Sequence, residues 1–184
     1  MKATGIVRRI DDLGRVVIPK EIRRTMRIKE GDPLEIFTDS EGGVILKKYS
    51  PIGELTNFAS EYAESLQQTI GNIILISDKD NIISVSGIAK KEYLEKRISN
   101  EFEKAMEDRK SATLGEGLGK IIPIFKDENI DNKYSAQVIS PIISEGDVIG
   151  SVVIASREEG KKFTEIELKL AETAASFLGK QMEA

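Results

Sequence analysis

The sequence contains no cysteine and no histidine among its 184 residues. Without cysteine the chain has no disulfide, no thiol nucleophile and no thiolate metal site, and a cytoplasmic location is the default expectation. Without histidine as well, Ser-His-Asp, Cys-His and zinc-hydrolase chemistry are excluded. Carboxylates and lysines remain available for acid–base catalysis. These absences favour a protein that is not an enzyme, with no catalytic residues, no metal and no cofactor.

Long hydrophobic runs are missing too. No run approaches the roughly 18 apolar residues that a membrane span needs, and the first residues lack the apolar stretch of a signal peptide. The composition is 40% hydrophobic and 32% charged, which is ordinary for a globular protein. We therefore expect no membrane partner.

Basic residues are concentrated at the start of the chain. Residues 1–50 carry eleven basic and eight acidic side chains, whereas residues 51–184 carry sixteen basic and twenty-three acidic ones. Within residues 1–29 the count is nine basic, six of them arginine, against three acidic. A basic module on an acidic body is typical of a protein that binds a polyanion through the module alone.

The first fifty residues predict four strands and one short helix, in the order β-β-α-β-β. Pro19 suits the first position of the helix, because its fixed φ matches helical geometry. A domain of this size buries too little apolar surface to be stable alone. We therefore predict an obligate dimer whose hairpins share one core. The strands are predicted at residues 4–10, 15–18, 34–38 and 44–49, and the helix at residues 19–28.

Residues 51–55 predict a linker, and residues 56–184 a second domain. The second domain is predicted to begin with a helix whose apolar residues recur at helical spacing. It is predicted to end with a helix that starts at a capping box formed by Thr164 and Glu167. Its order, α-β-β-α-β-β-β-α, predicts an α+β domain whose antiparallel sheet is flanked by helices. The strands are predicted at residues 72–77, 81–86, 120–125, 134–143 and 148–155, and the middle helix is predicted to end near Arg109.

The predicted helix at residues 19–28 groups its basic side chains. At about 100° per residue, Lys20, Arg23, Arg24 and Arg27 fall within one arc, and Ile22 and Met26 face the other way, toward a core. Such charge is often only solvated surface. Here the scarcity of acids favours a binding face for a polyanion. Three more arginines extend the face, namely Arg8, Arg9 and Arg15.

Residues 4–24, with the stretch Gly-Arg-Val-Val-Ile-Pro at 14–19, resemble the AbrB family of swapped-hairpin regulators. The resemblance implies an intertwined β-barrel dimer that presents arginines to double-stranded DNA. It points to four contact residues, Arg8, Arg15, Arg23 and Arg24. Charge and geometry add Lys2, Arg9, Lys20 and Arg27.

Residues 56–184 are similar to a GAF domain, most closely in the hairpin at 138–154. A chain that joins an AbrB-like domain (residues 1–50) to a GAF-like domain (residues 56–184) resembles a family that regulates late sporulation genes. This implies a nucleoid-associated homotetramer, joined through the body, with a possible small-molecule effector. Ser84, Ser86 and Gly87 are the candidates for an effector pocket, and the alternative is a pocket already filled by core residues.

Four alternatives stay open or fall at this point. Swapped-hairpin heads also occur in antitoxins, although a folded second domain is unusual there. The first and last helices of the second domain each have an apolar face. These faces either contact another subunit or pack within the domain itself. The glycines at 115–119 have the wrong spacing for a phosphate loop. Residues 78–81 start like a calcium loop, but Ile82 and Ile83 stand where a ligand and a glycine belong, so the segment predicts a hairpin turn.

Overall fold

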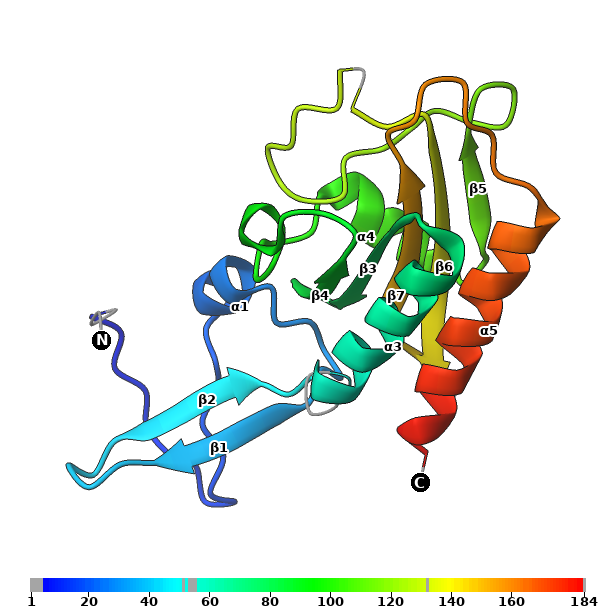
Figure 1. Ribbon diagram of the computed structural model, residues 1–184. Helices are drawn as coiled ribbons and strands as arrows, with labels where there is room; N and C mark the ends of the chain where they lie inside the picture. The colour runs from blue at the N-terminus through cyan, green and yellow to red at the C-terminus, as the bar shows by residue number, and fades with distance from the viewer. Residues whose placement is uncertain (1–4, 51, 53–55, 132, 184) are drawn as a thin grey trace. The chain divides into compact units, whose positions relative to one another are not determined.

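A computed structural model describes residues 5–50, 52, 56–131 and 133–183 (Figure 1). The chain divides into two compact units, Met1–Tyr49 and Ser50–Ala184. Residues 51 and 53–55 of the predicted linker lie outside the described part, whereas Ile52 is fully buried in the core of the second unit. Among the residues that the structure describes, no helix is long and apolar enough to cross a membrane.

The first unit contains a short helix followed by a hairpin. Its elements are helix α1 (Lys20–Met26), strand β1 (Leu34–Thr38) and strand β2 (Val44–Lys48). The strands pair antiparallel, which confirms the predicted hairpin. Asp39 closes the turn, because its N–H donates to the Gly43 carbonyl at 3.0 Å. Its carboxylate accepts the N–H groups of Glu41 and Gly43 at 3.0 and 2.7 Å.

The strands predicted at residues 4–10 and 15–18 do not form in the single chain. No strand is assigned within residues 5–18, and Thr4 lies outside the described part. Asp11 and Arg15 are joined only across a turn, where the Asp11 N–H donates to the Arg15 carbonyl at 3.0 Å. A strand is stable when a neighbouring strand accepts its N–H and C=O groups. The β-branched pattern is present, but the single chain does not supply the neighbouring strand.

The second unit is built on a five-stranded antiparallel sheet with the strand order β4-β3-β7-β6-β5. The strands are β3 (Ile73–Asp78), β4 (Ile82–Ser86), β5 (Ala112–Gly115), β6 (Ala136–Ser144) and β7 (Asp147–Ser156). The helices are α3 (Thr56–Ile70), the 3₁₀ turn η1 (Lys90–Glu92), α4 (Asn100–Glu107) and α5 (Glu165–Gln181). Apart from η1 this is the predicted order of helices and strands, but the strand before β6 lies at residues 112–115 and not at the predicted 120–125.

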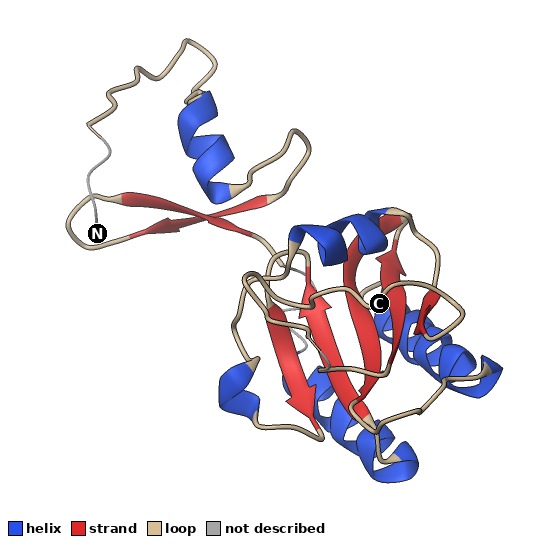
Figure 2. Ribbon diagram, turned by 90° about the horizontal axis from the view of Figure 1, so that it is seen from above, coloured by secondary structure: helices blue, strands red, loops and turns tan. Residues whose placement is uncertain are grey.

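Helices cover both faces of this sheet. Helices α3 and α5 lie side by side on one face (Figures 1 and 2). Helix α4 packs on the other face through Phe102 and Met106 (Figure 2). Strand β7 is buried on both faces from Ile149 to Ser156, so its sequence is mostly apolar from Val148 to Ala155, interrupted only by Gly150 and Ser151, in place of a strict alternation.

Helix α5 begins where the capping box predicts. The Thr164 hydroxyl accepts the Ile166 N–H at 3.2 Å, and Glu167 Oε2 accepts the Thr164 N–H at 2.7 Å. These bonds satisfy N–H groups that the first helical turn leaves unpaired. The helix then buries Ala171, Ala174 and Leu178 against the sheet.

The strand predicted at residues 120–125 is wrong, and the edge strand is β5. Ile122 makes its bonds with a side chain: its N–H donates to Gln137 Oε1 at 3.1 Å, and its carbonyl accepts Gln137 Nε2 at 2.9 Å. Pro123 follows and has no N–H for a ladder. The segment is apolar because it packs over the sheet, and its apolar character alone did not distinguish a covering loop from a strand.

Candidate functional sites

Helix α1 positions two arginines at its end. Pro19 precedes the helix at the N-cap, one residue earlier than predicted, and its carbonyl accepts the Arg23 N–H at 3.0 Å. Glu21 lies in the first turn, where the helix dipole favours an anion. Arg27 ends the helix in a left-handed conformation with φ 52°. Arg23 and Arg24 therefore occupy the last turn, where the dipole favours cations.

The basic residues of the α1 face differ in exposure. Lys20, Arg23 and Arg24 are exposed, whereas Arg27 is half-buried. The Arg27 carbonyl accepts a hydrogen bond from Lys48 Nζ of β2 at 3.3 Å, which joins the helix end to the hairpin. The exposed side chains form a cationic surface on the helix, suited to phosphate oxygens.

Arg15 is held by the turn that precedes α1. Its Nε donates to Asp11 Oδ2 at 2.8 Å, and its backbone N–H donates to Asp11 Oδ1 at 2.7 Å. The hydrogen bond from the Arg15 backbone, with that from its guanidinium, lowers the pKa of Asp11 below its usual value. Gly14 supports the turn with φ +76°. The Arg15 side chain stays 68% exposed, so the turn orients it without covering it.

Arg8 and Arg9 are exposed on the segment before that turn, and Lys2 lies outside the described residues. The structure thus places three predicted basic residues on one helix face and Arg15 in a fixed turn. Arg8 and Arg9 lie on a segment without strand pairing.

The first unit leaves most of its apolar side chains exposed. Between residues 5 and 49 only Pro19 is buried. Met26 is 44% exposed and Ile22 only half-buried, although both were predicted to face a core. Apolar exposure of this extent marks an interaction surface. The other large hydrophobic side chains exposed here are Ile6, Val7, Ile10, Leu13, Val16, Val17, Ile36, Phe37, Val44 and Tyr49.

Of the predicted effector residues, Ser84 lies in the middle of β4, and Ser86 and Gly87 lie at its C-terminal end, where Gly87 is close to Gln67 of α3. Ser84 is buried and stands opposite Ile76, whose side chain belongs to the core under α3 and α5. Residues opposite one another in antiparallel strands share a face. Gly87 has φ +81°, and a side chain there would meet the Asn72 carbonyl. A cavity lies at the other end of β4, and none of Ser84, Ser86 and Gly87 lines it.

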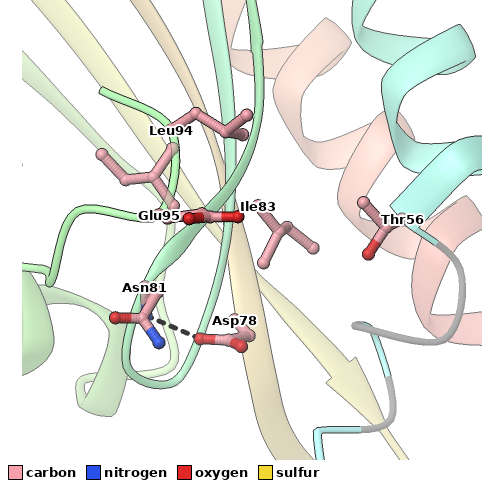
Figure 3. A pocket seen from close by; sticks show the side chains of 7 residues that line it. Thr56, Asp78, Asn81, Ile83, Leu94 and Glu95 are labelled. Carbon is pink, nitrogen blue, oxygen red and sulfur yellow. Dashed lines mark hydrogen bonds between the residues drawn. The ribbon is translucent and has the colours of Figure 1, made fainter. Parts of the chain in front are cut away.

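That cavity, of about 420 Å³, lies at the sheet edge formed by β4. The β3–β4 turn forms one wall: Asp78 Oδ1 accepts the N–H groups of Asp80 and Asn81 at 2.7 and 2.6 Å. This is the predicted hairpin turn. The lining residues are Thr56, Asp78, Asn81, Ile82, Ile83, Leu94 and Glu95 (Figure 3).

A buried polar network lies on the α4 side of the sheet. Glu128 Oε1 accepts hydrogen bonds from Lys133 Nζ at 2.6 Å and from the Tyr134 hydroxyl at 2.8 Å. The hydroxyls of Tyr134 and Tyr93 are 2.6 Å apart, and an Arg157 guanidinium nitrogen donates to Tyr93 at 2.8 Å. The network fills part of this side of the domain with paired charges and aromatic rings.

Burial fixes the protonation states in this network. Burial, with the Tyr93 hydrogen bond and the Glu128 carboxylate, raises the pKa of Tyr134 far above its usual value, so its hydroxyl stays protonated. Burial alone lowers the pKa of Lys133, but its hydrogen bond to Glu128 and its interactions with Tyr93 and the Glu128 charge together outweigh burial, and the pKa is raised. Sequence reasoning missed this network. The only sign of the network in the sequence is that Glu128, Lys133 and Tyr134 lie close together in one loop.

Comparisons with known proteins agree with both halves of this description. Residues 54–183 match the family described as "Stage V sporulation protein T C-terminal, transcription factor". Residues 7–54 match the family described as "Antidote-toxin recognition MazE, bacterial antitoxin".

Two relatives are from Bacillus subtilis (strain 168). Stage V sporulation protein T is 55% identical over 183 residues, covering 100% of this chain and 99% of that protein. Transition state regulatory protein AbrB is 65% identical over 51 residues, covering 28% of this chain and 52% of that protein. The predicted AbrB-like character of the first fifty residues is thereby confirmed.

Among solved structures, the blue-light absorbing form of the Thermosynechococcus elongatus PixJ GAF-domain is similar, with a TM-score of 0.55. It is 12% identical and covers 74% of this chain and 89% of that chain. At that identity the likeness concerns the fold alone, and it confirms the predicted GAF-like fold of the second unit.

Proposed function

Because the chain belongs to the stage V sporulation protein T family of transcription factors, we propose that it is a DNA-binding regulator of late sporulation genes. Residues 1–50 form the DNA-binding domain, residues 51–55 the linker, and residues 56–184 the regulatory and oligomerisation domain. The protein acts in the cytoplasm at the nucleoid and is not an enzyme.

The observation that carries this proposal is the exposed basic face of α1. Lys20, Arg23 and Arg24 project from a two-turn helix, and the exposed Arg15 stands just before it. Arginine forks match phosphate oxygens and guanine edges. We assign DNA contact to Arg8, Arg15, Arg23 and Arg24, with support from Lys2, Arg9, Lys20 and Arg27.

Dimerisation of the first unit follows from its exposed apolar surface. Val17 is 68% exposed and Ile36 is 66% exposed in the single chain. Burying such side chains contributes about 25 cal/mol per Å² of apolar surface, which is the main stabilisation open to a unit without a core of its own. A second copy supplies both the missing core and the strand partners for residues 5–18.

The α3/α5 layer supports assembly into a tetramer. Phe177 packs against Phe58 and Tyr62, with ring centroids 5.7 and 5.5 Å apart, yet it remains 39% exposed. Ile166 on the same helix is 68% exposed. The inner faces of both helices pack within the domain, and these outer side chains offer an apolar patch to another copy.

Fluorescence anisotropy with a labelled promoter duplex tests the DNA-binding role. Arg23→Ala is expected to weaken binding at least about fivefold while leaving assembly intact. Lys126→Ala removes the same charge from an exposed position of the second unit and serves as the control. Equal affinities for the two variants would remove the assignment to α1.

A second candidate function is an antitoxin that regulates its own operon, since residues 7–54 match an antitoxin family. Such a protein co-purifies tightly with a toxin. The folded second unit, matched by a transcription-factor family, favours the first proposal. Purifying this protein from its native cells, with no tag on any partner, distinguishes the two proposals. Only an antitoxin would co-purify with a toxin in a fixed molar ratio.

A further inference from the structure

The cavity at the β4 edge combines an apolar wall with polar groups that carry no positive charge. Ile83 and Leu94 provide the apolar surface, since Ile82 is only 1% exposed, and Leu94 is 40% exposed although it is a large hydrophobic residue. A volume of about 420 Å³ lies within the range of small-molecule sites, roughly 300–1,000 Å³.

The acidic side chains of the cavity differ in what they do. Asp78 is engaged by the turn, because its two oxygens accept bonds from Asp80, Asn81 and Ser50. The Glu95 carboxylate makes no hydrogen bond or ion pair with any residue that the structure describes. Thr56 lies across the cavity from Glu95, with Ile83 between them (Figure 3).

Glu95 is also held in a sparsely populated backbone conformation. Its φ is 62°, which side-chain-bearing residues rarely adopt, and its N–H donates to the Ile82 carbonyl at 2.8 Å. That bond fixes the Glu95 backbone beside β4, next to the cavity. Backbone strain of this kind costs on the order of 1–3 kcal/mol and clusters at binding sites.

We propose that this cavity binds a small organic cation, an ammonium group joined to a branched aliphatic portion. The ammonium pairs with Glu95 and the Asn81 amide oxygen, and the aliphatic portion covers Ile83 and Leu94. An anionic ligand is disfavoured, because the lining residues include two carboxylates and no basic side chain. This inference rests on the proposed regulatory role of the second unit, and it names a ligand class and a site for that role.

Isopentylamine is the probe, with isopentanol and isovalerate as neutral and anionic molecules of similar skeleton. Titration calorimetry or saturation-transfer NMR on the full chain at neutral pH ranks the three. We expect the amine to bind more tightly than the alcohol, and the carboxylate to bind least. Equal binding of amine and alcohol, or no binding of the amine, overturns the proposal.

Glu95→Gln keeps the shape of the side chain and removes its charge. We expect it to weaken amine binding about two- to fivefold, as for a partly exposed ion pair. Glu92→Gln is the matched control, since Glu92 is an exposed acid of η1 outside the cavity. Equal effects of the two variants also overturn the site.

Promoter anisotropy is measured on the same samples. Intact promoter binding without amine binding refutes the ligand site alone. If the unsubstituted protein does not bind the promoter, the proposed function is refuted instead.

Discussion

The Ser50 hydroxyl donates a hydrogen bond to Asp78 Oδ2 at 3.0 Å, joining the start of the second unit to its β3–β4 turn. Two residues later, Ile52 is fully buried in the core that α3 and α5 share with the sheet. The first residues of the second unit are therefore held to the rest of that unit at two points, Ser50 and Ile52.

Ser50→Ala removes that hydrogen bond and leaves Asp78 Oδ2 without this donor. We expect the free energy of unfolding of the second unit to fall by about 0.5–1.5 kcal/mol, measured by urea denaturation. Ser40→Ala alters an exposed serine in the β1–β2 turn and is the control. If both variants unfold at the same urea concentration, the hydrogen bond contributes nothing measurable.

Val17→Asp tests the dimer. In a monomer, a substitution at a 68% exposed site changes stability by less than about 0.5 kcal/mol. In a shared dimer core it buries an unpaired carboxylate, so we expect loss of the dimer in sedimentation velocity. Ser40→Asp adds the same charge at the hairpin turn and should leave the dimer intact. A dimeric Val17→Asp protein would contradict the shared core.

Glu128→Ala tests the buried network. The change leaves Lys133 Nζ and the Ile124 N–H without their acceptor, so we expect a loss of about 3–5 kcal/mol in the free energy of unfolding. Glu64→Ala removes an exposed acid from the middle of α3 and should be nearly neutral. If Glu128→Ala lowers the free energy of unfolding by less than about 1 kcal/mol, the network does not contribute substantially to stability.

The capping box of α5 predicts an acid-side dependence of stability. Partial burial raises the pKa of Glu167, but hydrogen bonds from Thr164 outweigh it and hold the pKa below the usual 4.5. A lowered folded-state pKa stabilises the fold above pH 4.5, and that contribution disappears as pH falls through the folded-state pKa. The difference in melting temperature between the native protein and Glu167→Gln should therefore shrink below pH 4.5. A constant difference across that range would contradict the assignment.

The fold of the second unit was largely predictable, because its signals are local. The apolar spacing of α3 and the Thr164–Glu167 capping box specify helices through contacts within a few residues. The segment at 120–125 was not predictable, because its backbone is satisfied by Gln137 from a distant strand. The Glu128 network likewise depends on tertiary pairing.

In the first unit the sequence predicted the helix, the hairpin and the basic face. It also predicted strands at 4–10 and 15–18, and no strand forms within residues 5–18 of the single chain. The residues proposed for an effector site, Ser84, Ser86 and Gly87, were chosen from their place at a strand end. Strand position alone does not locate a cavity, since a cavity depends on how side chains from several elements fill space.

The salt dependence of promoter binding tests the central claim most directly, because it counts the phosphates neutralised by the arginine face. If a dimer contacts six to eight phosphates, log K against log salt should fall with a slope of roughly −5 to −7, at about 0.9 per contact. Arg23→Ala with Arg24→Ala should make that slope markedly shallower, and Lys126→Ala should leave it unchanged. A slope near zero in the native protein, or one insensitive to both arginines, would contradict DNA binding through this face.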